Sequence, residues 1–186
     1  NAIAIVERGE HGRREEISFQ ELKDKVSKIR YYLLEQGVKQ GDCVAGFLPN
    51  SHHAIVAMLA TASIGAIWTS CSPDFGIQGV LDRFQQTQPK VLFACDGYYY
   101  ANKTIHTLDR VETICESLET LNSCVIVPYL NVQDQSNLSN KILWPALLNI
   151  ETPPLKYAPV SFNSPLYVMY SSGTTGKPKC IVHTVG

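Results

Sequence analysis

The chain has 186 residues, a formal net charge of −1 and 45% hydrophobic residues, values that are ordinary for one globular domain. The near-neutral charge, with no basic stripe, argues against a nucleic-acid partner. The most apolar stretch, Ala54–Trp68, contains polar residues and is shorter than the roughly 20 residues that span a bilayer, so no membrane span is expected.

The first 130 residues alternate between helix and strand patterns. Ser18 and Glu21 form a capping-box pattern ahead of apolar residues at helical spacing, and Gly37 is a suitable end for this helix. Further predicted elements are a strand at Cys43–Leu48, a helix from Ser51 to near Gly65, a strand at Ile67–Ser70, a helix over Ile77–Gln85 with Asp74 as its cap, a strand at Val91–Ala94, a helix at Thr107–Leu118 and a strand at Cys124–Val127. This alternation predicts an α/β fold with a mainly parallel sheet and helices on both faces.

Two polar features of this region are interpreted as solvent-exposed. The charge run Arg13–Glu16 neutralises itself and is typical of a solvated turn. The pair His52 and His53 raises the hypothesis of a metal site, but adjacent helical residues point to different sides of a helix. We therefore expect the two histidines to be exposed and no metal to be bound there.

Residues 131–165 differ in composition from the rest, being rich in Asn, Gln, Ser and Pro around one short apolar patch, Ile142–Leu148. We expect a surface connection that carries one short helix. The chain is thus divided into an α/β portion at 1–130, this connection at 131–165, and a strand with a loop at 166–186.

The six cysteines are widely spaced, with no C-x-x-C pair and no cluster with histidine. This distribution indicates unpaired thiols rather than a disulfide framework. It favours a reducing compartment, and we expect the protein in the cytosol.

The segment Tyr170–Lys179, with the sequence YSSGTTGKPK, concentrates groups that bind phosphate. The preceding run Leu166–Tyr170 is apolar and β-prone, so the loop is expected at the end of a buried strand. Glycines at 173 and 176 allow positive φ and leave backbone N–H groups accessible, while four hydroxyls and two lysines supply donors and positive charge.

The spacing within this loop differs from common nucleotide motifs. Two residues separate Gly173 from Gly176, where the P-loop has four, and Pro178 follows Lys177 in place of Ser or Thr. Because proline lacks an N–H and fixes φ, the loop is not expected to run straight into a helix. The alternative is an ordinary Ser/Gly/Thr linker, but the preceding strand and the paired lysines favour a phosphate site.

The loop resembles the phosphate-binding signature of the adenylate-forming enzymes, which include acyl-CoA synthetases, luciferases and adenylation domains of peptide synthetases. Ile17–Leu22 and Gly37–Ser51 resemble other segments of that family, in the right order. Gly65–Gly76, which ends in Ser-Pro-Asp-Phe-Gly, resembles the acetoacetyl-CoA synthetase branch. The resemblance covers essentially the whole chain and implies that residues 1–186 are an incomplete part of the large N-terminal, AMP-binding domain of that fold.

In the resembled family, a carboxylate attacks the α-phosphorus of ATP and releases pyrophosphate, and coenzyme A then displaces AMP. The resemblance implies ATP, Mg²⁺, coenzyme A and acetoacetate as cofactors and substrates, and it puts the family's catalytic lysine outside these 186 residues. Lys179 is the lysine of the family motif, whereas Lys177 lies at a more variable position. The implied phosphate-binding residues are Ser171, Ser172, Gly173, Thr174, Thr175, Gly176 and Lys179.

Two residues after the loop, Cys180 and His183, need a separate interpretation. Cys180 stands where many members of the family have glycine. His183 either orients a substrate or magnesium-bound water, or is a histidine at the start of a helix, and we favour the second interpretation.

The leading functional hypothesis is part of an acetoacetate–CoA ligase of lipid, fatty-acid and ketone-body metabolism. One alternative is a ligase for acetate, propionate or another short acid. The other is a truncated, non-catalytic product, because the family's adenine pocket and C-terminal domain are absent from these residues. We expect this chain alone to be inactive.

Overall fold

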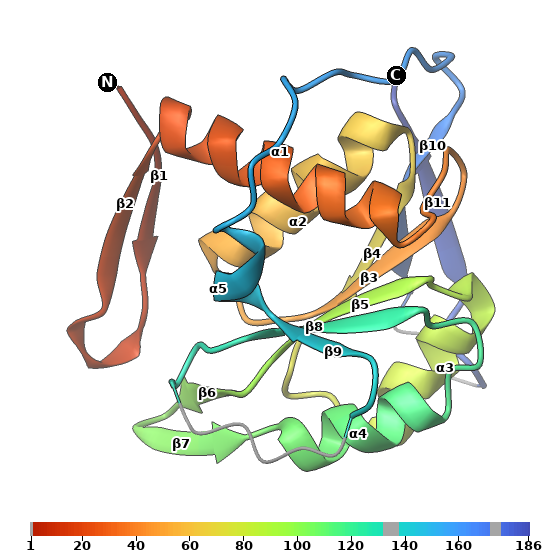
Figure 1. Ribbon diagram of the computed structural model, residues 1–186. Helices are drawn as coiled ribbons and strands as arrows, with labels where there is room; N and C mark the ends of the chain where they lie inside the picture. Colours follow the sequence, from red (N-terminus) through yellow and green to blue (C-terminus); the bar gives the residue numbers. More distant parts are fainter. Residues whose placement is uncertain (1, 132–137, 172–175) are drawn as a thin grey trace.

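A mostly parallel sheet forms the centre of the structure, a computed structural model that describes residues 2–131, 138–171 and 176–186 (Figure 1). The strands are β1 (Ile3–Arg8), β2 (Arg14–Ser18), β3 (Cys43–Phe47), β4 (Ile67–Cys71), β5 (Val91–Cys95), β6 (Gly97–Tyr100), β7 (Lys103–His106), β8 (Ser123–Val127), β9 (Lys141–Leu143), β10 (Pro165–Tyr170) and β11 (Cys180–Thr184). The helices are α1 (Phe19–Glu35), α2 (His52–Ile64), α3 (Ile77–Thr87), α4 (Leu108–Glu116) and α5 (Trp144–Leu147), with a 3-10 turn, η1, at Glu10–Gly12.

The central sheet has the strand order β11-β10-β4-β3-β5-β8-β9 among the described residues. Every neighbouring pair in it is parallel except β10 and β11, which are antiparallel. Two separate hairpins, β1-β2 and β6-β7, complete the strand inventory of the described part. The predicted α/β fold with a mainly parallel sheet is therefore confirmed.

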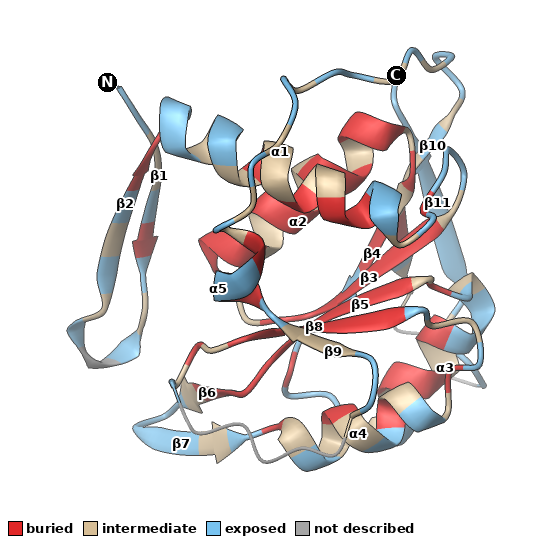
Figure 2. Cartoon of the chain, viewed as in Figure 1, coloured by how far each residue is buried: buried red, intermediate tan, exposed pale blue. Residues whose placement is uncertain are grey.

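Helices cover both faces of this sheet, as expected: α1, α2 and α5 lie on one face, and α3 and α4 on the other (Figure 1). All residues of β3, β5 and β8 are buried, and Figure 2 shows these strands in the buried colour between the helical layers. Being covered on two sides, they need apolar residues at every position, which explains their continuous rather than alternating hydrophobic pattern.

Most of the predicted helix ends agree with the structure. Ser18 and Glu21 form the expected reciprocal capping box at the start of α1, and Gly37 follows this helix with a φ of +75°. The expected cap of α3 is wrong, because the residue before that helix is Gly76 rather than Asp74.

Residues 131–165 contain the expected short helix, α5, and also a strand that the sequence did not indicate. This strand, β9, pairs with β8 at the end of the central sheet. Trp144 directly follows it and is 2% exposed, packed edge-on against Phe93 of β5. The segment thus contributes side chains to the core.

The interpretation of Arg13–Glu16 as a solvated turn is wrong, because the run enters β2 of an N-terminal hairpin. Arg13 Nε lies 3.3 Å from Glu7 Oε1, and its guanidinium stacks on Tyr129 at 4.3 Å from the ring centre. The charges therefore hold the hairpin against the segment that follows β8.

Glu7 of this hairpin caps α2, and the expected exposure of the two histidines is also wrong. The backbone N–H of His52 donates to Glu7 Oε2 at 2.7 Å, and His52 Nδ1 lies 2.8 Å from the same oxygen. His52 and His53 are only 3% and 9% exposed. The first N–H groups of a helix need acceptors, and here a carboxylate from a distant strand supplies one and also contacts the His52 ring, while His53 packs against Trp144.

We predict that His53 makes the stability of the fold depend on pH. Burial, reinforced by electrostatic interaction with His52, Arg13 and Lys25, lowers the pKa of His53 to about 2. The unfolded chain protonates this ring near its ordinary pKa of 6.5, so the native state should lose stability as the pH falls below that value. The expected contribution is at most about 1.4 kcal/mol per pH unit.

The test is urea unfolding of a His53→Phe variant between about pH 7.5 and pH 5. Phenylalanine keeps a ring beside Trp144, whose centroid lies 5.1 Å from that of His53, but it cannot be protonated. The variant should show a shallower loss of stability with acid than the wild type, whereas His183→Phe, at an exposed position, should match the wild type. Equal slopes for all three proteins would refute the prediction.

Candidate phosphate-binding site

The predicted phosphate loop connects β10 and β11, two antiparallel strands at one side of the central sheet. Strand β10 pairs in parallel with β4, so the loop leaves at the carboxyl ends of both strands, the edge where α/β sheets bind ligands. The expected strand before the loop is confirmed, and so is the expectation that no helix follows directly. The strand is less buried than expected, with only Val168 buried, because it lies one position from the end of the described sheet.

The loop has two described arms, its entry at residues 170–171 and its exit at residues 176–180, and hydrogen bonds join them. The N–H of Ser171 donates to the carbonyl of Lys179 at 3.0 Å, and the N–H of Lys179 donates to Ser171 Oγ at 3.2 Å. Gly176 has a φ of +89°, the left-handed conformation that glycine was expected to supply. Both Gly176 and Lys179 are exposed. Residues 172–175, which include four of the predicted site residues, lie outside the described residues.

Tyr170 anchors the first arm of the loop to two neighbouring elements. Its hydroxyl lies 2.7 Å from Thr69 Oγ1 of β4 and 3.5 Å from Thr87 Oγ1 of α3, and Thr69 Oγ1 also lies 2.9 Å from the Val168 carbonyl oxygen. Burial raises the pKa of Tyr170 to about 12, so this hydroxyl keeps its proton at neutral pH. Sequence reasoning did not identify these anchors, since a tyrosine and two threonines carry no distinctive pattern.

A cavity of about 510 Å³ opens beside Tyr170, at the carboxyl ends of β4 and β10. Its walls are mainly apolar, with the hydroxyls of Ser70 and Ser72 and the guanidinium of Arg83 among them, a mixture typical of small-molecule pockets. The lining residues are Met58, Trp68, Ser70, Cys71, Ser72, Phe75, Arg83, Tyr167, Val168, Met169 and Tyr170.

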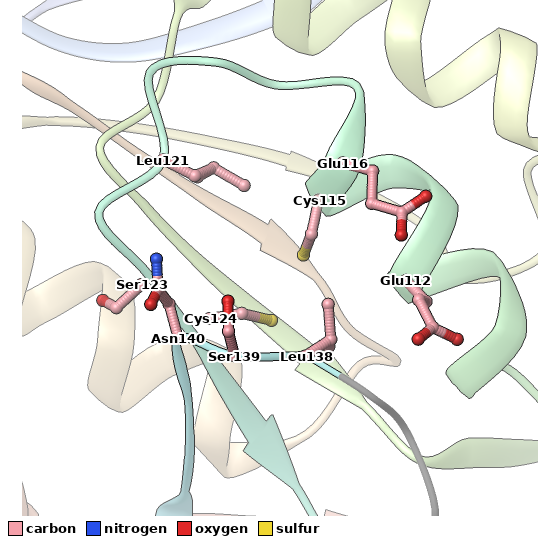
Figure 3. A pocket seen from close by; sticks show the side chains of 9 residues that line it. All are labelled: Glu112, Cys115, Glu116, Leu121, Ser123, Cys124, Leu138, Ser139 and Asn140. Atoms are coloured by element: carbon pink, nitrogen blue, oxygen red, sulfur yellow. The ribbon is translucent and has the colours of Figure 1, made fainter.

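A smaller cavity of about 160 Å³ lies between α4, the start of β8 and the segment before β9 (Figure 3). The thiols of Cys115 and Cys124 turn toward its interior, and the carboxylates of Glu112 and Glu116 lie on its α4 side (Figure 3). Three strands separate β8 from β10, and two carboxylates would repel a polyphosphate. This cavity is therefore not part of the candidate phosphate site.

One side-chain cluster among the described residues has the composition of a metal site, but it does not suit Mg²⁺. One group of three potential ligands, Glu7, His52 and His53, has its ligand atoms within 4.8 Å of one another. Both oxygens of Glu7 already contact Arg13 or His52, and Mg²⁺ prefers oxygen ligands to imidazole nitrogens. The cluster is explained as a helix cap in which Glu7 is paired with Arg13.

Three further expectations from the sequence concern His183, the cysteines and membrane-spanning helices. His183 is an exposed residue of β11, so its interpretation as a helix-start histidine is wrong. None of the six cysteines forms a disulfide in the described structure. In the part of the chain that the structure describes, every helix is too short or too polar to cross a lipid bilayer.

Comparison with known proteins assigns this arrangement to a family. A family model for AMP-binding enzymes matches residues 1–186, and the chain belongs to that family. The chain is similar to the acetoacetyl-CoA synthetase of Macaca fascicularis, with 42% identity over 177 residues that cover 91% of this chain and 26% of that protein. It is also similar to the acetoacetyl-coenzyme A synthetase of Rhizobium meliloti (strain 1021), with 43% identity over 188 residues, 98% of this chain and 28% of that protein.

The fold agrees with a solved relative. The acetoacetyl-CoA synthetase from Streptomyces lividans matches with a TM-score of 0.86 and 42% sequence identity, covering 92% of this chain and 26% of that one. The predicted family, its acetoacetyl-CoA synthetase branch and the N-terminal part of the adenylate-forming fold are thereby confirmed. The chain spans about a quarter of the length of the relatives that it matches.

We predict that Tyr170→Phe lowers the free energy of unfolding by about 1 kcal/mol, because Thr69 and the mostly buried phenol lose their mutual hydrogen bond. Urea denaturation at neutral pH measures the change. Tyr157→Phe is the matched control, since Tyr157 is 73% exposed, and it should leave the stability unchanged. Equal effects of the two substitutions would show that the hydroxyl does not anchor the loop.

Proposed function

We propose that the chain is part of an acetoacetate–CoA ligase and that residues 171–176 and Lys179 bind the phosphates of ATP. The main supporting observation is the position of this loop at the carboxyl ends of β4 and β10, beside a cavity of about 510 Å³, in a chain 42% identical to acetoacetyl-CoA synthetases. The proposed reaction has two steps. The carboxylate of acetoacetate attacks the α-phosphorus of ATP and expels pyrophosphate, and the sulfur of coenzyme A then displaces AMP from the acyl-adenylate.

The role of the loop in this proposal follows from charge. Pyrophosphate departs with several negative charges, and donors that are held in place around it stabilise those charges as they develop. Lys179 supplies the positive charge, and its exposed side chain extends from a backbone that is fixed to Ser171. The proposed donors are Ser171, Ser172, Gly173, Thr174, Thr175, Gly176 and Lys179.

The remaining participants are proposed on the similarity alone. Coenzyme A and acetoacetate are proposed from the similarity to acetoacetyl-CoA synthetases, and Mg²⁺ is proposed to accompany ATP. A cytosolic location fits the absence of disulfides among the six cysteines. A ligase for acetate or propionate is the competing proposal, and a non-catalytic product is the other.

The choice of acid is tested in a complete protein, because this chain spans about a quarter of its relatives. Acid-dependent release of AMP should be faster with acetoacetate than with acetate or propionate at equal concentration. The isolated chain should show no acid-dependent ATP–pyrophosphate exchange. A preference for acetate or propionate would replace the proposed substrate, and exchange by the isolated chain would overturn its proposed inactivity.

The role of Lys179 is tested by comparing Lys179→Ala with Lys177→Ala in the complete protein. Both side chains are exposed, and they lie two residues apart in the same arm. Loss of a charge-assisted contact to phosphate should weaken ATP binding by roughly 10- to 100-fold for Lys179→Ala, with a much smaller effect for Lys177→Ala. Equal losses, measured by calorimetric titration with ATP, would contradict the assignment of Lys179.

A further inference from the structure

Gln86, in the last turn of α3, contacts the backbone of the loop from outside the loop itself. Its Nε2 donates to the carbonyl of Pro178 at 2.9 Å, and its Oε1 accepts a hydrogen bond from Cys180 Sγ at 3.5 Å. The same Nε2 also donates to the carbonyl of Asp82, one turn earlier in α3, at 2.6 Å. Both N–H groups and the carbonyl of this amide are therefore in use, which fixes the orientation of the side chain.

The two residues that Gln86 contacts, Pro178 of the loop and Cys180 at the start of β11, lie on either side of Lys179. Pro178 has no N–H, so its carbonyl is its only backbone group that can be tied down. The backbone of Lys179 is itself bonded to Ser171 at the end of β10. The arm at 178–180 is consequently held from two directions, by β10 through Ser171 and by α3 through Gln86.

The helix that carries Gln86 is itself firmly placed. Val80 and Phe84 of α3 are fully buried in the core between this helix, α4 and the sheet. Thr87 Oγ1 lies 3.5 Å from the Tyr170 hydroxyl, and the guanidinium of Arg83 lies 5.6 Å from the centre of the Tyr170 ring. The C-terminal part of α3 therefore contacts both arms of the loop, and its packing in the core restricts their movement.

We propose that Gln86 is a positioning residue of the phosphate loop, whose amide holds the Pro178 carbonyl and the Cys180 thiol and thereby sets the place of Lys179 between them. The inference rests on the proposed function of the loop. Donors stabilise developing charge best when they are held in place beforehand, and a free arm would have to lose conformational entropy on binding. Gln86 touches no phosphate in this proposal and acts only through Pro178 and Cys180.

The test uses Gln86→Ala in the complete protein, with Gln85→Ala as the matched control, since Gln85 is an exposed glutamine in the same turn of α3. Hydrogen exchange followed by mass spectrometry should show faster exchange of the Lys179 amide in Gln86→Ala and no change in Gln85→Ala. The KM for ATP should rise about fivefold to tenfold in Gln86→Ala, the effect of losing roughly one net hydrogen bond, while the KM for the acid stays unchanged.

The outcomes separate this inference from the proposed function. If the wild type binds no ATP, the proposed function fails, and the exchange rate of the Lys179 amide still tests the contact. If ATP binds, and Gln86→Ala matches Gln85→Ala in both the exchange rate and the KM, the positioning role is overturned. A uniform fall in thermal stability with an unchanged KM for ATP would also overturn it, because Gln86 would then support only the fold.

Discussion

The candidate site depends on the pairing of β10 with β4, because this pairing brings residues far apart in the sequence to one edge of the sheet. The parallel contact itself is short, with register pairs Tyr167–Trp68 and Val168–Thr69. The hydroxyl of Thr69 reinforces it by joining the Val168 carbonyl to the Tyr170 phenol. Because these groups are largely withdrawn from water, their hydrogen bonds are costly to break, and the loop starts from a defined point.

A second polar contact occupies the neighbouring part of the same edge, at the start of α2. The carboxyl ends of parallel strands and the helix N-termini that follow them attract anions. After β3, however, Glu7 of the N-terminal hairpin already occupies the start of α2 and is balanced by Arg13. The chain thus supplies its own carboxylate at one helix start, whereas no carboxylate is among the described residues that line the cavity beside β10.

The sequence predicted the fold better than it predicted the surroundings of the site. Local patterns were sufficient for β3, β5, β8 and the capping box of α1, because continuous apolar runs and caps are set by neighbouring residues. Strand β9 could not be predicted, since it has only three residues in a polar segment and forms by pairing with β8. The burial of the two histidines could not be predicted either, because Glu7, the partner of His52, lies 45 positions away and Trp144 packs on His53 from a distant segment.

The candidate site shows the same division between local and long-range information. Its glycines, hydroxyls and lysines form a compact motif that the sequence alone reveals. The residues that support the loop are not revealed in this way, because Thr69, Thr87 and Gln86 each contact it across 83 or more positions.

Arg83, Gln86 and Thr87 occupy positions i, i+3 and i+4 of α3, and so face one side of that helix. One residue inserted into or deleted from α3 ahead of Arg83 would turn this side by about 100° and aim it away from the loop. The number of residues between Gly76, directly before α3, and Arg83 therefore affects the support of the loop, in addition to the loop motif itself.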